Sequence, residues 1–400
     1  MNTPVCPHAA VCGGCSYQGV PYEEQLELKN AAVLEYLSEN SLFPGEYRPA
    51  RATSKLYGYR NKMEYSFGDE VKGGPMTLGL HKQGSYMSVI NTDDCLIVPE
   101  SFNRIRAAVL EWALRSGHGF HHKRSHSGFL RNLVLRRGER SGELLVNLVT
   151  TSEETLDEVA FCETIFAATG SSIQTPPLDA PGEEFPDRIV GVLHTINDRR
   201  SDVVACDSVK PLYGRDYYLD KLLRFDFRVG AFSFFQTNTS AVEYMLDEAL
   251  AFIPNMHIGN LYDVYCGTGT ISLALSRRVS RVTGIELVED SVLSARENAA
   301  RNGVKNADFI CGDAFEVMRE LTPPDLIIVD PPRMGLHPKA LKRVIEYGLP
   351  AILYISCNPK TFAQNAAILS NAGYGIPVLG AYDNFPFTKH IELAALLEKR

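Results

Sequence analysis

The stretch DVYCGTGTISLAL, residues 263–275, decides the fold. An apolar run that suits a β-strand ends at Gly267 and Gly269, and a helical pattern begins directly after them. Such glycines let the backbone approach a ligand at the carboxyl end of a strand, where open α/β sheets bind their ligands. The third glycine of the dinucleotide-binding pattern G-x-G-x-x-G is missing, because Ser272 holds its place. S-adenosylmethionine has no pyrophosphate, so the sequence favours this cofactor over a dinucleotide.

Strand and helix patterns alternate around this stretch, from about residue 231 to the end. The strand-like runs lie near residues 260–265, 281–286, 307–311, 325–330, 352–356, 375–381 and 391–397. Helical patterns separate the first six runs, which predicts a parallel-type sheet. Only the short segment YDNFPFTKH (382–390) precedes the last run, which should therefore be antiparallel to its neighbour. We predict an α/β fold, a Rossmann-like domain of about seven strands over residues 231–400.

Residues 1–230 show a different pattern, in which short strands and turns predict an α+β region. Examples of strands are LLVNLVT (144–150) and RIVGVLHTIN (188–197). An amphipathic helix is expected over residues 22–41. Its apolar face should hold Leu26, Val33, Leu34 and Leu37.

Composition limits the class of protein. The 400 residues are 45% hydrophobic and 22% charged, and there is no apolar run of membrane-spanning length and no export signal. We therefore expect a cytoplasmic protein with reduced thiols. The net charge of −8 argues weakly against a nucleic-acid partner. The stretch 118–140, however, holds six Arg or Lys and four His. It is either a local phosphate-binding face or a solvated hairpin.

Acidic residues follow the successive strands of the predicted sheet. Glu286 ends the second run, where a carboxylate can accept both hydroxyls of a ribose. Asp313 follows the third and suits the edge of an adenine, and Asp330 ends the fourth, in DLIIVDPPRMG (325–335). Each alone is typical of a cap or loop residue. Together with the glycines they indicate an S-adenosylmethionine pocket.

A thiol and a carboxyl group suggest the chemistry of this pocket. In YISCNP (354–359), Cys357 ends a strand and precedes a helix capped by Asn358, where the helix dipole favours the thiolate. Glu392 interrupts the apolar last run, and partial burial should raise its pKa. A thiolate that adds to C6 of a uracil makes C5 nucleophilic toward a methyl donor, and a base must then remove the C5 proton. Arg333, in the Pro-Pro-Arg turn, suits a carbonyl or phosphate better than an amine.

Three cysteines cluster near the N-terminus in CPHAAVCGGC, at positions 6, 12 and 15. Cys95 is the nearest candidate for a fourth ligand. Four thiolates can hold zinc or a [4Fe–4S] cluster, and the spacing does not decide between them. The remaining cysteines are expected to be buried fillers: Cys162, Cys206, Cys266 and Cys311.

With these motifs in place, nearly the whole chain resembles the RNA uracil-5-methyltransferases that carry a [4Fe–4S] cluster and make 5-methyluridine. The resemblance implies that Cys357 is the nucleophile and Glu392 the base, within the family pattern F-P-x-T-x-H-x-E. It implies that the cluster ligands are Cys6, Cys12, Cys15 and Cys95. It implies that the cofactor pocket is lined by Gln236, Tyr265, Thr270, Glu286, Asp313 and Asp330. It further implies a central RNA-binding domain around the cluster, within residues 1–230, and a helix 22–41 that packs on the catalytic domain.

One departure from the family concerns the substrate. Some members begin with a small OB-like barrel that binds RNA, whereas this sequence starts at the cluster motif. The cluster favours a uridine of 23S ribosomal RNA over the T-loop uridine of tRNA, and we expect a monomer. Two other functions stay open: an Fe–S redox protein with a nucleotide-binding domain, and a methyltransferase acting on cytosine or an exocyclic amine.

Overall fold

The computed structural model describes residues 5–53, 55–170, 187–200, 204, 206–254 and 257–400. The chain divides into two compact units. The first unit comprises Met1–Gly19, Lys55–Lys221 and Arg228–Phe232. The second comprises Val20–Ser54, Leu222–Phe227 and Ser233–Arg400. The segment that holds the predicted helix 22–41 thus belongs to the second unit, although it precedes most of the first in sequence. In the described residues no helix is long and apolar enough to cross a membrane.

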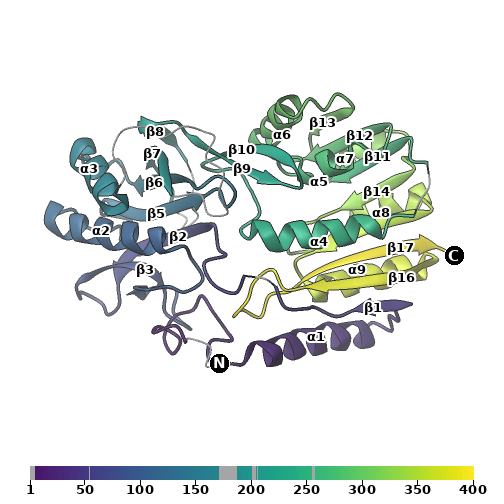
Figure 1. Cartoon of the computed structure of the whole chain (residues 1–400), viewed down its shortest axis with the longest axis horizontal. Coiled ribbons are helices and arrows are strands. Elements are labelled where there is room, and N and C mark those ends of the chain that lie inside the picture. The colour runs from purple at the N-terminus through teal and green to yellow at the C-terminus, as the bar shows by residue number, and fades with distance from the viewer. Residues whose placement is uncertain (1–4, 54, 171–186, 201–203, 205, 255–256) are drawn as a thin grey trace. The chain divides into compact units, whose positions relative to one another are not determined.

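The first unit is built on a seven-stranded sheet of order β4-β3-β2-β5-β6-β7-β8. Its strands are β2 (Lys62–Asp69), β3 (Met76–His81), β4 (Val89–Asn91), β5 (Leu130–Arg137), β6 (Glu143–Thr150), β7 (Arg188–Ile196) and β8 (Ser208–Gly214). Neighbouring strands are antiparallel except β6 and β7. Helices α2 (Glu100–Ser116) and α3 (Glu158–Thr169) pack against each other over this sheet (Figure 1). The predicted α+β character of this part of the chain is confirmed.

The basic stretch 118–140 is not one continuous surface in this unit. Its second half is strand β5, and the side chains of Arg131 and Arg136 are buried. Arg131 donates hydrogen bonds to the carbonyl oxygens of Asn197 (2.6 Å) and Arg199 (2.7 Å). Two of the six basic side chains therefore lie in the interior of the unit. Neither of the two predicted alternatives, a solvated hairpin or a phosphate-binding face, applies to the whole stretch.

The second unit contains an eight-stranded sheet of order β1-β16-β17-β15-β14-β11-β12-β13. Its strands are β1 (Glu46–Arg48), β11 (Asn260–Val264), β12 (Arg281–Glu286), β13 (Ala307–Cys311), β14 (Leu326–Val329), β15 (Ala351–Ser356), β16 (Tyr374–Tyr382) and β17 (Glu392–Lys399). All seven predicted strands are present, and β17 is antiparallel to both of its neighbours, as predicted. The eighth strand, β1, was not predicted; it pairs in parallel with β16. Its three residues are too few to show an alternating pattern.

Helices surround this sheet in the way an alternating α/β sequence predicts. They are α1 (Tyr22–Glu39), α4 (Thr239–Ala251), α5 (Thr270–Leu275), α6 (Glu289–Arg301), α7 (Ala314–Glu320), α8 (Pro338–Tyr347) and α9 (Pro359–Asn371). One apolar core joins α1, α7, α8 and α9 to one face of the sheet. Helix α4 contacts β16 and β17 on the opposite face. Two further strands, β9 (Tyr217–Leu222) and β10 (Phe225–Gly230), pair only with each other.

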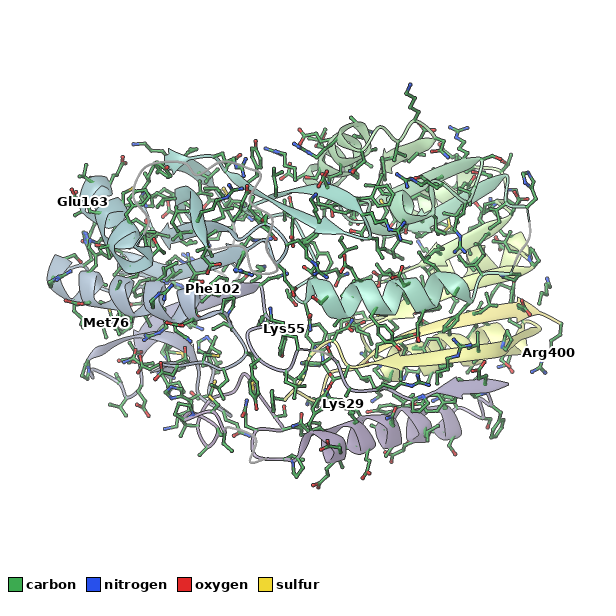
Figure 2. The ribbon with its side chains drawn as sticks, viewed as in Figure 1. Lys29, Lys55, Met76, Phe102, Glu163 and Arg400 are labelled. Atoms are coloured by element: carbon green, nitrogen blue, oxygen red, sulfur yellow. The ribbon has the colours of Figure 1, made fainter. Side chains whose placement is uncertain are left out.

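Helix α1 buries most of the face that its apolar residues predict, and Leu26 packs against the core. Val33 and Leu37 are buried as expected, but Leu34 is 47% exposed. Lys29 takes part in the buried face, and Figure 2 labels it on α1. Its Nζ lies 2.6 Å from a carboxylate oxygen of Asp383, and neither side chain is exposed. The prediction failed only at Leu34, and it missed the buried position of Lys29, because hydrophobicity does not register an ion pair.

Removal of one partner from this pair should destabilise the second unit. In Lys29→Met the carboxylate of Asp383 stays buried without its cation, and we expect a loss of about 3–5 kcal/mol in the free energy of unfolding. Urea unfolding followed by circular dichroism measures it. Leu34→Ala, on the exposed side of the same helix, is the control and should change stability by less than about 0.5 kcal/mol. Equal stabilities of the two variants would contradict the role of the pair.

Candidate active site

The turn after β11 is held by a carboxylate from the next strand. Gly267 and Gly269 have φ values of 52° and 85°, and the non-glycine Tyr265 has a φ of 69°. A side chain in this left-handed region is strained, and such residues concentrate at functional sites. Glu286 accepts hydrogen bonds from the backbone N–H of Gly267 (3.1 Å) and of Val288 (2.9 Å). The turn predicted from GTG is therefore present and braced by the predicted ribose ligand.

Four of the six predicted cofactor residues line one small cavity next to this turn. They are Gln236, Tyr265, Thr270 and Asp330, around a volume of about 40 Å³. Glu286 is outside the lining but bonds Gly267, which belongs to it. Asp313 is at the N-terminus of α7, where its carboxylate accepts from two backbone N–H groups, at 3.0 and 3.2 Å. Asp313 thus has a structural role as a helix cap, and the adenine contact stays a prediction.

Asp263 is a buried acid of this region that the motif analysis did not single out. Ser272 donates a hydrogen bond of 2.6 Å to its carboxylate, and burial raises the pKa of Asp263 to about 6. This bond gives a physical reason for a serine at the position of the missing third glycine. The available signal was an aspartate inside a strand that is otherwise apolar.

Strand register brings Cys357 and Glu392 to one place. Ser356 pairs with Leu393 across β15 and β17, so Cys357 follows directly opposite Glu392. Alternate residues of a strand point to opposite faces, and Tyr354 and Leu393 belong to the core with α9. Cys357 and Glu392 therefore point to the other face. The same alternation from Val329 directs Asp330 to that face, beside the cavity it lines.

The turn Pro331-Pro332-Arg333 is tied to the helix that follows Cys357. Asn358 caps α9 by accepting from the backbone N–H of Lys360 (3.2 Å), as predicted, and Pro359 is the first helical residue. The same side chain donates from Nδ2 to the carbonyl oxygen of Arg333 (2.9 Å). One asparagine thus fixes both the start of the helix and the turn, a second contact that a capping pattern does not reveal.

The acids at this edge have raised pKa values. Burial raises the pKa of Glu392 to about 8 and the pKa of Asp330 to about 7, and Asp330 adds to the effect on Glu392. The rise predicted for Glu392 is confirmed. Burial, with Glu392 and Asp330, also raises the pKa of Cys357 to about 11. The expectation that the helix dipole would favour the thiolate was wrong in direction, because burial and two nearby carboxylates outweigh it. The Arg333 guanidinium opposes these effects and lowers both pKa values.

The loop that precedes Glu392 is fixed by helix α1. Asp383 accepts hydrogen bonds from Tyr22 (2.9 Å) and Lys29 (2.6 Å), and Lys29 also donates to the carbonyl oxygen of Phe385 (3.1 Å). Gln25 accepts from the backbone N–H of Phe387 (2.9 Å), whose φ is 65°. Polar side chains of α1 thereby hold a strained loop in place. The resemblance implied that this helix packs on the catalytic domain, but it did not identify these polar contacts, whose partners lie some 350 residues later in the chain.

The four predicted metal ligands meet in the first unit. Cys6, Cys12, Cys15 and Cys95 line one cavity of about 20 Å³. Burial raises the pKa of Cys15 to about 11 and of Cys95 to about 12, and the nearby thiols add to each rise. In the described part of the chain no three His, Cys, Asp or Glu side chains are arranged to hold a metal ion as they stand. The thiols surround a common space rather than converging on a point.

The other four cysteines were expected to be buried, and this prediction was largely wrong. Only Cys266 is buried; Cys162 and Cys206 are partly exposed, and Cys311 is exposed.

Comparisons with known proteins agree with this arrangement. A family model described as tRNA (uracil-5-)-methyltransferase matches residues 215–400. An uncharacterized RNA methyltransferase of Caldanaerobacter subterraneus is 42% identical over 395 residues, 98% of this chain and 84% of the relative. One from Clostridium acetobutylicum is 40% identical over 99% of this chain and 84% of its own length. The crystal structure of Pyrococcus abyssi tRNA (uracil-54, C5)-methyltransferase with S-adenosyl-L-homocysteine has a TM-score of 0.76 at 27% identity, over 98% of this chain and 86% of that one.

The fold and these matches define an α/β methyltransferase. The chain belongs to the RNA uracil-5-methyltransferase family.

The pKa of Cys357 can be tested by its alkylation. Reaction with iodoacetamide requires the thiolate, so its rate should rise with pH well beyond the range of an ordinary thiol. Glu392→Gln removes a negative charge and should shift this profile to lower pH, whereas Arg333→Ala should shift it higher. Peptide mass spectrometry follows Cys357 separately from the exposed Cys311, whose profile should not change. An unshifted Cys357 profile in Glu392→Gln would contradict the coupling.

Proposed function

We propose that this enzyme transfers a methyl group from S-adenosylmethionine to C5 of a uridine in RNA, with 23S ribosomal RNA as the substrate. The observation that carries the proposal is the pair Cys357 and Glu392, side by side at a strand edge, on the same face as a cavity lined by Asp330. An Fe–S redox protein would have no use for this pair. The S-adenosylhomocysteine in the Pyrococcus abyssi structure supports the choice of donor.

Each residue of the pair has a distinct task in this reaction. Cys357 loses its proton to water, a step that Arg333 favours, and its sulfur adds to C6 of the uracil, so that electron density moves to C5 and O4. When bound, S-adenosylmethionine supplies a methyl group that C5 takes up. Glu392, as the carboxylate, then removes the proton from C5, the C5–C6 double bond forms again and the Cys357 sulfur leaves. A pKa of about 8 makes Glu392 a stronger base than an ordinary glutamate.

An RNA substrate places a further requirement on the reaction, and Arg333 is suited to such a substrate. The uracil must leave its stack to reach Cys357, since C5 and C6 are covered in a helix. The Arg333 guanidinium, which is exposed and lies 3.2 Å from a ring nitrogen of His390, is suited to the carbonyl or phosphate oxygens of such a nucleotide. A cytosine carries an amine in place of O4, which Arg333 suits less well.

A uridine of tRNA is the alternative substrate. Two observations favour it: the matching family model is described as a tRNA methyltransferase, and the Pyrococcus abyssi enzyme acts on uracil 54 of tRNA. The cysteine motif of the first unit is the argument for ribosomal RNA.

We further propose that Cys6, Cys12, Cys15 and Cys95 hold a [4Fe–4S] cluster. The support is that all four line one cavity, and thiolates are the ligands such clusters require. The backbone N–H of Gly14 lies 3.4 Å from the sulfur of Cys12, a type of contact that tunes bound clusters. The raised pKa values of Cys15 and Cys95 mean that metal binding must displace protons.

Metal analysis distinguishes the cluster from zinc. Protein purified without oxygen should contain about four iron atoms per chain and should show the visible absorption of an Fe–S centre. Cys95→Ala should lose most of this iron, whereas Cys206→Ala, outside the cavity, should retain it. Stoichiometric zinc with little iron would refute the cluster.

Glu392→Gln should allow methyl transfer but block the release of the methylated RNA from Cys357. The variant lacks the base that removes the C5 proton, so methylated RNA should stay bound to Cys357 as a complex that survives SDS. Turnover should fall by at least about a hundredfold. Gel electrophoresis with labelled RNA detects the complex, and the double variant with Cys357→Ala is the control that should lack it. Full methylation by Cys357→Ala alone would exclude the covalent mechanism.

Deletion of the gene identifies the substrate. Mass spectrometry of nuclease fragments should show one 5-methyluridine lost from 23S ribosomal RNA in the deleted strain, and purified enzyme should restore it. Loss from a tRNA fragment instead would establish the alternative. An unchanged map, in a strain without a redundant enzyme, would refute uridine methylation.

A further inference from the structure

A second, larger cavity lies in the same unit as Cys357 and has no part in the reaction described above. Its volume is about 250 Å³, against about 40 Å³ for the cavity at Asp330. Its walls come from the end of β1 and the segment after it, from one side of α4, and from the end of β16 with the residues that follow it. The side chains that matter here are Arg48, Arg51, Tyr244, Glu248 and Tyr382.

Strand register fixes the position of this cavity relative to the nucleophile. Tyr382 pairs with Glu392 across β16 and β17, and Cys357 is opposite Glu392 on the other side. Three adjacent strands thus present Tyr382, Glu392 and Cys357 in one row. Leu379 and Ala381 belong to the core on the α9 side, so Tyr382 points to the same face as Glu392 and Cys357. Two strand spacings amount to about 10 Å, a distance that one or two nucleotides of a single strand can bridge.

The lining has the chemistry of a nucleotide site. The ring centroids of Tyr244 and Tyr382 are 6.1 Å apart with an angle of 71° between the planes, and Tyr244 is 49% exposed, as a ring that stacks on a base must be. Arg51 is exposed and forms no ion pair among the described residues. The cavity also meets the N-terminus of α4, a helix of 13 residues, at Ser240 and Ala241. These groups favour an aromatic ring that carries a phosphate.

The remaining polar groups restrict what can bind. Arg48 donates a hydrogen bond from Nε to a carboxylate oxygen of Glu46 (2.8 Å), and its guanidinium lies over the ring of Phe252. It therefore contributes positive charge to the cavity, but its guanidinium is already occupied by these two contacts. Glu248 accepts from the hydroxyl of Tyr244 at 2.8 Å and would repel a free anion such as inorganic phosphate. A carboxylate suits the N–H edge of a base instead.

We propose that this cavity binds a nucleotide of the substrate RNA that flanks the target uridine, with its base against Tyr244 and its phosphate on Arg51. This inference rests on the proposed function and extends it, because it makes part of the RNA specificity a property of the second unit. The base is one with an N–H group that can face Glu248.

Photo-crosslinking tests the site directly. Short single-stranded RNAs carry 5-fluorouridine, which traps Cys357 because fluorine cannot leave as a proton does, and 4-thiouridine at one flanking position at a time. We expect one flanking position to crosslink to the peptide that contains Tyr244. An abasic nucleotide there should weaken binding roughly tenfold, the scale of one stacked base.

Variants provide the matched comparison. Tyr244→Ala and Arg51→Ala should each raise KM for RNA roughly tenfold, with kcat within a factor of two. Arg51→Ala should also lower the slope of the logarithm of the binding constant against the logarithm of the salt concentration by about one, because one phosphate contact is lost. Phe43→Ala, an exposed aromatic residue, and Arg281→Ala, at the amino end of β12, are the controls and should change neither.

The outcomes separate this inference from the proposed function. Trapping at Cys357 without a crosslink to α4, and with unchanged KM in both variants, overturns the nucleotide site and leaves uridine methylation intact. A crosslink to α4 with no trapping at Cys357 retains the nucleotide site and contradicts the covalent mechanism.

Discussion

The buried ion pair of Lys29 and Asp383 is the interaction that ties helix α1 to the loop before Glu392. It joins a helix near the start of the chain to the loop before the last strand, and neither side chain is exposed. Such a pair is costly to desolvate, and its retention makes sense where geometry matters more than stability. Here it holds the loop in which Phe387 is strained and from which Glu392 emerges. The position of the proposed base is therefore set by residues far from it in sequence.

Strand alternation imposes a second constraint, which is electrostatic. Asp330, Cys357 and Glu392 all point to one face at one edge, so three acids share a small, partly dry space. Burial and Asp330 raise the pKa of Cys357 and of Glu392, Glu392 also raises that of Cys357, and Arg333 lowers both. At neutral pH the resting site consequently keeps its thiol and its base protonated. Because the thiolate is the nucleophile, the proposed reaction requires Cys357 to lose its proton when substrate binds.

The sequence predicted those features that depend on local pattern. The seven strands, the turn at Gly267, the cap at Asn358 and the antiparallel last strand follow from periodicity, glycine and the length of one connection. The failures all concern tertiary surroundings. The burial of Lys29 on α1 was missed because its partner is more than 350 residues away. The state of Cys357 was misjudged because a helix dipole is a small effect beside burial and two carboxylates.

The raised pKa values explain why the donor and the nucleophile suit each other. Asp330 lines the cavity proposed for S-adenosylmethionine, and its charge state influences both Cys357 and Glu392. A positive charge in that cavity lowers the pKa of all three acids, since an opposite charge favours each ionised form. The thiol and the base therefore become competent when a cation is present beside them, and the proposed donor is cationic before transfer and neutral afterwards. In the proposed reaction, the ionised forms of Cys357 and Glu392 are thus favoured while the methyl group is still on the donor.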